Sequence, residues 1–577
     1  MRVLPSGDCA LLVELSSLAE VLALFHEAIG CPPQGIREIV PAARTLLVQF
    51  DPEAVSASAI SGWVRGLSHR IETDGVASVL SRPSHRVEIP VRYTGEDLEE
   101  VAGMLGLSPA QVIERHTGRD YLAAFTGFAP GFVYLTGGDP CFAGTPRRAV
   151  PRTRVPAGSV AIGGDFSAVY PSDSPGGWRL LGVTPLRMWD LDRDAPALLQ
   201  PGFGVRFRDL AAPDVHYSLP NGSNRESRPP AREDVRSAGE DAPHAGNGAI
   251  RSARGRRPDE DSGAASDQTW FEVLTPGPQT LFQDCGRPGM TALGVSGSGA
   301  LDRASMAAAN RLAGNPPETA VLENVWGGLT MVCHGGQAVV AVTGAPVAVV
   351  LTTASGMRIP AAGGSGLLIE DGQTLRLGRP RAGMRCYVAV RGGWDVPPVL
   401  GSRSTDVLSG IGPAIVSKGS RLKIADPAIG ARAAGGRGAG APNPGVEAEN
   451  GADPARLFPR SGDRVLLDIV LGPRDDWFDA PSLDRLQRQD WTVTPQSNRV
   501  GLRLEGEQPM TRAKAGELPS EGMVAGAIEV PPSGQPVLFL ADHPLTGGYP
   551  VVAVAMGRCL NKLAQVSPGV RLKFRVA

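Results

Sequence analysis

The chain has 577 residues, too many for one hydrophobic core, and at roughly 100–200 residues per domain it predicts three or four domains. Its formal net charge of −2 excludes the basic surface on which nucleic-acid binding depends. Glycine (73 residues) and proline (51 residues) together exceed a fifth of the chain, which favours short strands joined by tight turns.

The seven cysteines are widely spaced and form no CxxC pair, so neither a zinc site nor a disulfide framework is indicated. The N-terminal residues lack the basic-then-apolar layout of a signal peptide. The sequence contains no run of about 20 apolar residues, so no membrane span is expected. We therefore expect a cytoplasmic protein that binds neither membrane nor nucleic acid.

Residues 1–82 alternate between strand and helix patterns and predict a small α+β domain. Residues 10–15 and 45–50 are expected to be strands. Residues 18–29 and 57–71 carry apolar side chains three and four positions apart, which predicts two amphipathic helices.

Residues 83–212 predict a β-barrel domain. A strand pattern at 86–91 is followed by a capping box at Ser108 and Gln111, with proline at the first helical position, so a helix is expected through Arg115. From about residue 120, strands broken by glycine and proline indicate a barrel or sandwich.

Residues 213–268 are rich in small, polar and charged residues and contain almost no large apolar side chains. Such a segment cannot bury enough surface to offset its ordering entropy, so we predict a disordered linker between two bodies. A Gly/Ala/Pro-rich stretch at 428–458 is predicted to be a disordered insertion.

Residues 269–427 and 459–577 predict two further β domains. One helix is expected from Asp302 to Ala313, with Gly314 as its C-cap. The strand candidates in the first of these domains are 338–342, 347–351, 366–369 and 386–390.

The motifs of several common enzyme classes are missing from the sequence. It has no GxxxxGK[ST], HExxH or GxSxG motif, and its eight histidines are scattered, so any nucleotide must bind by another route. Polar and charged side chains gather instead on glycine-bounded loops at 170–178, 282–289, 294–302, 400–405, 497–501 and 542–550. Each loop alone is expected to be a turn with a capping side chain, but together they favour a site for an anionic substrate or a metal–phosphate complex.

These loops carry a family resemblance. Residues 128–135, 151–159 and 170–178 resemble the B subunit of 5-oxoprolinase, the allophanate hydrolase subunit 1 type of domain. A second set of segments resembles the C subunit of 5-oxoprolinase, the allophanate hydrolase subunit 2 type of domain. These segments are 283–289, 294–302, 401–405, 497–501, 521–532 and 546–550. The chain thus resembles a fusion of the two, a pair also found in the carboxyltransferase region of urea carboxylase and urea amidolyase.

The resemblance implies a mainly β, multidomain fold with cyclophilin-like β-barrels at 83–212, 269–427 and 459–577, plus the small N-terminal α+β domain. It implies a component that works with a separate A subunit of 5-oxoprolinase, ATP and Mg²⁺ to open the lactam of 5-oxo-L-proline, giving L-glutamate. Four positions depart from the expected pattern: Ser296, Leu301, Val500 and Glu529 stand where proline, methionine, methionine and glutamine are usual. Of these departures, Glu529 and Ser296 leave open whether 5-oxoproline, urea or another amide is the substrate.

Two alternatives remain. The first is a biotin-dependent carboxyltransferase, whose carrier and carboxylase would act in trans because the chain has no Ala-Met-Lys-Met motif. The second is a non-enzymatic inhibitor of a histidine kinase, as relatives of this pair are described.

The site is predicted in the C-type half, facing the B-type half. Asp284, Arg287, Arg499 and Asp542 are the predicted catalytic residues: the arginines would hold phosphate or carboxylate, and either aspartate would bind Mg²⁺ or orient the nucleophile. Gln283 and Asn498 would hydrogen-bond a neutral amide. The predicted substrate-binding residues are Gln283, Ser298, Asp302, Arg403, Asn498, Thr546 and Ser174.

Overall fold

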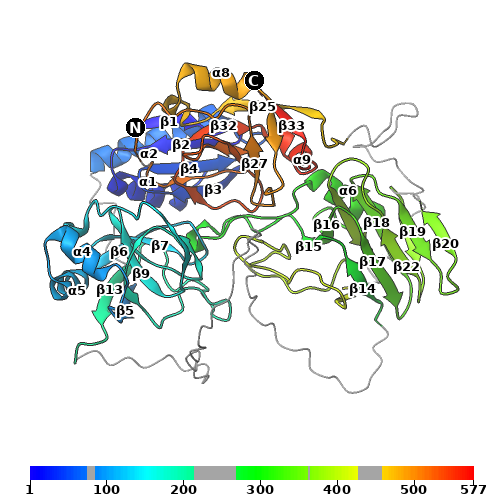
Figure 1. The fold of residues 1–577 in the computed structure, drawn as a ribbon, viewed down its shortest axis with the longest axis horizontal. Helices are drawn as coiled ribbons and strands as arrows, with labels where there is room; N and C mark the ends of the chain where they lie inside the picture. Colours follow the sequence, from blue (N-terminus) through cyan, green and yellow to red (C-terminus); the bar gives the residue numbers. More distant parts are fainter. Residues whose placement is uncertain (75–84, 214–267, 362–363, 426–457, 517) are drawn as a thin grey trace, which may run out of the picture.

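The computed structural model describes residues 1–74, 85–213, 268–361, 364–425, 458–516 and 518–577, which form four units along the chain (Figure 1). Apart from residues 213, 268 and 458, the predicted linker at 213–268 and the predicted insertion at 428–458 lie outside the described residues. Their disorder therefore stays a prediction.

The N-terminal unit is a four-stranded antiparallel sheet with two helices on one face. Its elements are β1 (Arg2–Pro5), β2 (Ala10–Glu14), α1 (Leu18–Gly30), β3 (Ile36–Pro41), β4 (Thr45–Phe50) and α2 (Ala57–Asp74), with strand order β1-β2-β4-β3. Because side chains alternate between the two faces of a strand, Leu11 and Val13 pack beneath the helices, while Ala10 and Leu12 point the other way. Both faces of the central strands β2 and β4 are covered, so these two strands are apolar at most positions.

The second unit is a seven-stranded sheet of order β12-β9-β10-β7-β6-β13-β5. Arg92 and Val183 exchange backbone hydrogen bonds of 2.8 and 2.9 Å, which joins the two edges and curls the sheet into a barrel. Its elements are β5 (Arg86–Val91), α4 (Leu98–Leu105), α5 (Pro109–Gly118), β6 (Tyr121–Thr126), β7 (Val133–Gly137), β8 (Arg152–Val155), β9 (Ser159–Gly163), β10 (Phe166–Val169), β11 (Ser174–Gly176), β12 (Arg179–Val183) and β13 (Gly204–Asp209).

The third unit has a six-stranded and a five-stranded sheet that share one apolar core, and α6 packs against β18 and β23. Its elements are β14 (Trp270–Pro276), β15 (Gln279–Gln283), α6 (Arg303–Ala313), β16 (Val321–Val325), β17 (Leu329–His334), β18 (Ala338–Gly344), β19 (Val349–Thr352), β20 (Arg358–Ala361), β21 (Gly366–Ile369), β22 (Thr374–Leu377), β23 (Arg385–Val390) and β24 (Arg421–Lys423).

The C-terminal barrel is closed, with strand order β25-β32-β29-β30-β27-β26-β33 and a parallel pair between β25 and β33. Its elements are β25 (Arg464–Leu471), α8 (Ala480–Arg488), β26 (Trp491–Val493), β27 (Gly501–Glu505), β28 (Glu521–Gly522), β29 (Ala527–Glu529), β30 (Val537–Phe539), β31 (Thr546–Gly547), β32 (Val551–Ala555), α9 (Leu560–Leu563) and β33 (Arg571–Val576).

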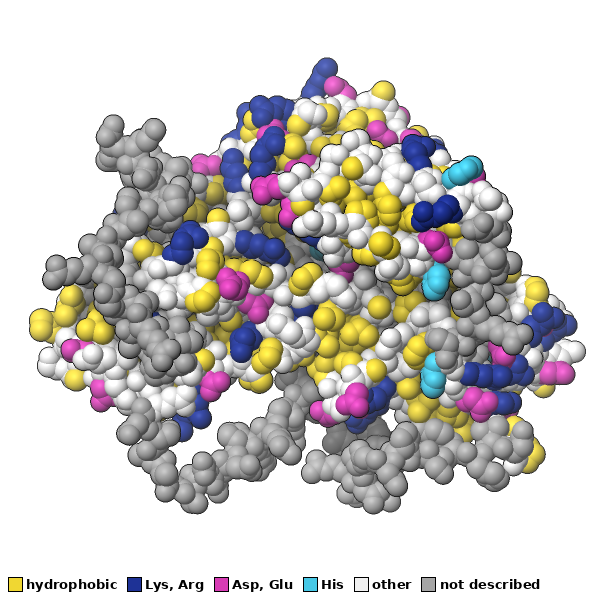
Figure 2. All heavy atoms as spheres, turned by 180° about the vertical axis from the view of Figure 1, so that it is seen from behind, with side chains coloured by type: hydrophobic (Ala, Val, Ile, Leu, Met, Phe, Trp, Pro, Cys, Tyr) yellow, Lys and Arg dark blue, Asp and Glu magenta, His cyan; other side chains and the backbone are white. Residues whose placement is uncertain are grey.

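The predicted fold class, mainly β and multidomain with an N-terminal α+β unit, is confirmed. The sequence patterns did not predict α4 and α8. Helix α8 is only nine residues long and begins with the Asp479 side chain accepting from Ser482 N, so its pattern is short and mostly polar. No helix among the described residues is long and apolar enough to cross a membrane. On the face shown in Figure 2, basic and acidic side chains are interspersed, in keeping with the small net charge.

The two halves of the chain meet over an apolar interface. In Figure 1 the blue N-terminal unit lies beside the orange and red C-terminal barrel, and both chain ends lie in this part of the molecule. Ala10, Leu12, Val40 and Leu47 of the N-terminal unit pack against barrel residues Met523, Val524, Ala527, Phe539, Val551 and Val554. A second contact joins the halves where Gly131 N donates to Leu293 O at 2.9 Å.

This interface predicts that the halves stay together without a covalent connection. A protease site inserted between residues 214 and 267, once cut, is expected to leave two fragments that co-elute on a sizing column. Each fully buried Val or Leu contributes about 1.5–3 kcal/mol, so the shared cluster is large enough for stable association. Fragments that separate after cutting would show that the connection, rather than the interface, holds the halves together.

Candidate functional site

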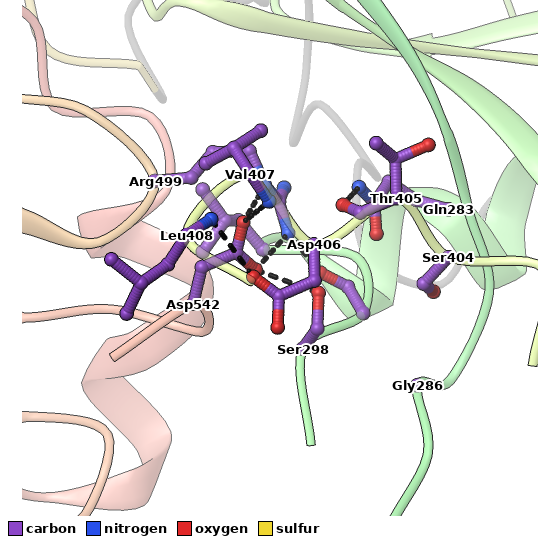
Figure 3. A network of polar contacts seen from close by, with 12 residues as sticks. Gln283, Gly286, Ser298, Ser404, Thr405, Asp406, Val407, Leu408, Arg499 and Asp542 are labelled. Atoms are coloured by element: carbon purple, nitrogen blue, oxygen red, sulfur yellow. Dashed lines mark hydrogen bonds and ion pairs between the residues drawn. The ribbon is translucent and has the colours of Figure 1, made fainter. Parts of the chain in front are cut away.

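Arg499 lies in a buried ionic network between the third unit and the C-terminal barrel (Figure 3). Its guanidinium donates to both carboxylate oxygens of Asp542 at 3.0 Å, to the Gly299 carbonyl at 2.6 Å, and to Glu323. Burial lowers the pKa of Arg499, but the Asp542 and Glu323 carboxylates outweigh it and raise this pKa above its usual value. All three guanidinium nitrogens therefore donate within the protein, as a buried charge requires.

Asp542 is engaged beyond Arg499. It accepts from Ser298 Oγ at 2.7 Å and from Val407 N at 3.0 Å. Its neighbour Asp406 accepts from Ser296 Oγ at 3.1 Å, and burial together with the Asp542 charge raises the pKa of Asp406. The donors to Asp542 thus surround its carboxylate, and the hydrogen bonds join loops of the two units.

The Asp284 carboxylate likewise accepts several hydrogen bonds, and these join two loops of the third unit. One carboxylate oxygen accepts from Gly286 N at 2.8 Å and from the hydroxyls of Ser402 and Ser404 at 2.6 Å, and the other accepts from Arg403 N at 2.6 Å. Four donors to one carboxylate leave little room for a metal ion.

Gln283, Arg287 and Arg403 also bond to backbone carbonyls. Gln283 Nε2 donates to Thr405 O at 2.8 Å, Arg287 donates to Ser404 O, and Arg403 Nε donates to the carbonyl of residue 396 at 2.8 Å. Burial lowers the pKa of Arg287. In the described part of the chain, Gln283 Oε1 and Arg287 Nη1 are buried with no hydrogen-bond partner.

Asp302 and Asn498 terminate or turn secondary structure. Asp302 is the N-cap of α6, accepting from Ser305 N at 3.0 Å, and it also accepts from Gln565 Nε2 at 2.9 Å. Asn498 is exposed and its side chain accepts from Val500 N at 2.9 Å, an Asx turn. Most of the predicted site residues thus use their side chains to cap a helix or to hold loops together. Their catalytic and binding roles stay predictions.

A cavity of about 460 Å³ lies elsewhere, between the second unit and the C-terminal barrel. Thr546 lines it, and Ser174 lies in β11, whose last residue Gly176 is part of the wall. Of these two predicted residues, only Thr546 lines the cavity itself, and the hydroxyls of both are buried without a hydrogen-bond partner among the described residues. The volume falls within the range of small-ligand sites, roughly 300–1,000 Å³.

The wall from the second unit is aromatic. It consists of Phe128, Phe132, Tyr134, Tyr170 and Trp178, and the Phe132 and Trp178 ring centroids lie 5.6 Å apart. Phe128 has a φ of 64°, a strained value for a residue other than glycine, and its ring meets Tyr170 edge-on at 6.1 Å. Burial raises the pKa of Tyr170 to about 12, so its phenol stays a hydrogen-bond donor at neutral pH.

Arginines from both sides complete the cavity. Arg147 lies 5.7 Å from the Trp178 ring centroid, and Arg148 pairs with Asp97 at 2.8 Å. From the barrel, Arg512 lies 5.4 Å from the ring centroid of Tyr549. The site therefore presents flat apolar faces beside several guanidinium groups.

Arg147, Arg148 and Arg512 are not among the site residues predicted from the sequence. The only signal in the sequence is their position: Arg147 and Arg148 lie four and three positions before the motif at 151–159, and Arg512 lies nine positions before the motif at 521–532. Sequence alone gave no reason to join them, because the two loops are more than 300 residues apart in the chain. Among the described residues, no group of three or more His, Cys, Asp or Glu side chains is placed to hold a metal ion.

Comparisons with known proteins show the family to which this chain is related. Residues 1–199 match the model described as "Carboxyltransferase domain, subdomain C and D", and residues 293–576 match "Carboxyltransferase domain, subdomain A and B". The chain belongs to this carboxyltransferase-domain family.

Each half of the chain is also similar to an individual named protein. The C-terminal half is 35% identical to the C subunit of 5-oxoprolinase from Escherichia coli K12 over 310 residues, covering 53% of this chain and 90% of the relative. The N-terminal half is 41% identical to the B subunit of 5-oxoprolinase from Escherichia coli O157:H7 over 199 residues, covering 34% of this chain and 87% of the relative. The chain is thus a fusion of B-type and C-type halves.

A solved structure shares the fused arrangement. The crystal structure of TTHA0988 is 31% identical, covers 98% of this chain and 99% of its own, and superposes with a TM-score of 0.72. The order of units along this chain is therefore found in another protein of the same kind.

Proposed function

We propose that this chain is the B and C component of an ATP-dependent 5-oxoprolinase, which opens 5-oxo-L-proline to L-glutamate together with a separate A subunit. Its relatives are components of enzymes that bear this name. The observation that carries the proposal is the cavity between the two halves, with arginines from both sides and a wall of aromatic rings.

The chemistry of 5-oxoproline suits this cavity. The molecule has one carboxylate and one flat lactam, and a guanidinium can donate two parallel hydrogen bonds to a carboxylate. The faces of Phe132, Tyr170 and Trp178 offer apolar surface for the ring. Arg147, Arg148 and Arg512 are the groups that we assign to the carboxylate and to other anionic groups in the site.

The cofactors of the proposal are ATP and Mg²⁺. When bound, ATP supplies the phosphoryl group that makes the lactam oxygen a leaving group. The cavity arginines fit the phosphate oxygens, since phosphoryl transfer depends mainly on positioning and charge neutralisation. The carboxylates of Asp284 and Asp542 accept several protein donors each, so we propose that Mg²⁺ enters with the nucleotide.

A carboxyltransferase is the second candidate, and the description of the matching family models favours it. In that reaction a carboxylated biotin, delivered by a carrier in trans, would pass its carboxyl group to a small amide such as urea. Carboxylation of urea by the chain with biotin carboxylase and carrier would support this candidate over the first.

The partner requirement gives the direct test. The purified chain alone is expected to form little or no glutamate from 5-oxoproline, and adding the A subunit with ATP and Mg²⁺ is expected to restore the activity. Glutamate release is measured with each component left out in turn. Full turnover without the A subunit would contradict the proposed division of labour.

A further inference from the structure

Glu529 lies directly behind the barrel side of the cavity. It is 6% exposed, and its Oε1 accepts from Tyr549 N at 3.1 Å. A Cβ placed on Gly547 would lie only 2.6 Å from Glu529 Oε1, so the carboxyl group packs against the backbone of that glycine. Because Gly547 and Tyr549 both line the cavity, Glu529 supports two consecutive parts of its wall.

The same strand end also fixes Arg512. Arg512 Nη2 donates to the carbonyl of Val530, the residue after Glu529, at 2.6 Å, and its guanidinium lies over the Tyr549 ring. Arg512 Nε is buried and has no hydrogen-bond partner within the described structure. The Glu529 carboxyl, Arg512 and Tyr549 thus form one group at the edge of the cavity.

Within the described part of the chain, the surroundings of Glu529 contain little other charge. Its cross-strand neighbours are Val537 on β30 and Val551 on β32. Among the residues that the structure describes, the titratable side chains that face this group are Arg512 and Tyr549, while Glu521 on β28, opposite Gly547, is paired with Arg474. Burial raises the pKa of Glu529 to about 7, although the Tyr549 amide and the Arg512 charge oppose the rise.

We propose that Glu529 is a positioning residue that makes the affinity of the cavity for an anion depend on proton uptake by its carboxyl group. When ionised, Glu529 partly neutralises Arg512 and weakens the attraction of the wall for a negative ligand. When protonated, it leaves the Arg512 charge uncompensated while still packing against Gly547. The inference rests on the proposed function only in taking a small carboxylate as the natural ligand.

The sign of the effect follows from this arrangement. Anion affinity should rise as the pH falls from 8 to 6, and anion binding at pH 7 should take up protons from solution. The probes are 5-oxo-L-proline, whose carboxyl stays ionised over this range, and sulfate. Both are titrated calorimetrically into the full chain, in buffers of different ionisation enthalpy that report the proton uptake.

We expect the Kd to be on the order of fivefold or more lower at pH 6 than at pH 8. Glu529→Gln, which keeps the shape and the acceptor for Tyr549 N, should bind at pH 8 as the parent does at pH 6, with a flat pH profile and no linked proton. Glu507→Gln, an exposed change in the same barrel, should keep the parent profile. Proton uptake by the parent protein tests the inference even if the Glu529 variant is unstable.

The outcomes separate this inference from the proposed function. Binding of 5-oxoproline that is independent of pH, with no proton uptake, overturns the role of Glu529 but not the substrate. Sulfate binding that depends on pH through Glu529, without 5-oxoproline binding, supports the role and contradicts the substrate. If neither anion binds, both are overturned.

Discussion

Replacing Arg512 with alanine is expected to lower ATP-dependent glutamate formation, measured with the A subunit present, by a factor of about 10² or more. Arg512 is the guanidinium that the C-terminal barrel contributes to the cavity. Removing one charged contact to a developing negative charge typically has an effect of this size. The side chain is only partly buried, so the melting temperature should stay within a few degrees of the parent value.

Arg503→Ala is the matched control for this experiment. Arg503 lies on β27 of the same barrel and its side chain is exposed, away from the cavity. Its removal should leave turnover unchanged. An Arg512→Ala protein that turns over normally would remove the cavity from the proposed mechanism, whatever its stability.

Replacing Arg499 with alanine should instead destabilise the protein by roughly 3–5 kcal/mol, as expected when one partner of a buried ion pair is lost. The fully buried Asp542 would lose the guanidinium that pairs with it, and Glu323, also fully buried, would keep only its longer ion pair of 3.5 Å with Arg385. The catalytic role that the sequence predicts for Arg499 implies a different result, in which turnover is lost while the melting temperature stays near the parent value. The observed contacts predict instead that the loss of stability is the main effect of the substitution.

Chemical denaturation of the parent and of Arg499→Ala measures this loss. Arg575→Ala, which removes an exposed pair with Asp468, should change stability by less than about 1 kcal/mol and serves as the control. If Arg499→Ala unfolds at the parent denaturant concentration and yet has lost its turnover, the catalytic role predicted from the sequence is the right one.

The sequence predicted best those elements whose signals are local. Helix α1 was expected at 18–29 and is found at Leu18–Gly30. Helix α6 was expected at 302–313 with Gly314 as its C-cap and is found at Arg303–Ala313 with that C-cap, Asp302 being its N-cap. The capping box of Ser108 and Gln111 is present as expected, although α5 runs three residues beyond Arg115 to Gly118. A cap and an apolar period are read from neighbouring residues, so no long-range contact is needed.

The candidate site depended on long-range contacts and was harder to predict. Charged residues on glycine-bounded loops marked Arg499 and Asp542, yet sequence does not distinguish a guanidinium that binds a ligand from one that joins two units. The two differ only in burial and partners, and Arg499 is 1% exposed. Conversely, Arg147 and Arg512 become neighbours across a cavity only after two barrels have folded and docked.

The contact between the first and last units has a consequence for synthesis on the ribosome. The apolar face formed by Ala10, Leu12 and Leu47 has its partners at Met523 to Val554, so it cannot be covered until nearly the whole chain has been translated. At 5–20 residues per second, this sheet face waits about 25–100 s after its own residues have been made until Val554 is reached. The nascent N-terminal unit is therefore an expected client of ribosome-associated chaperones.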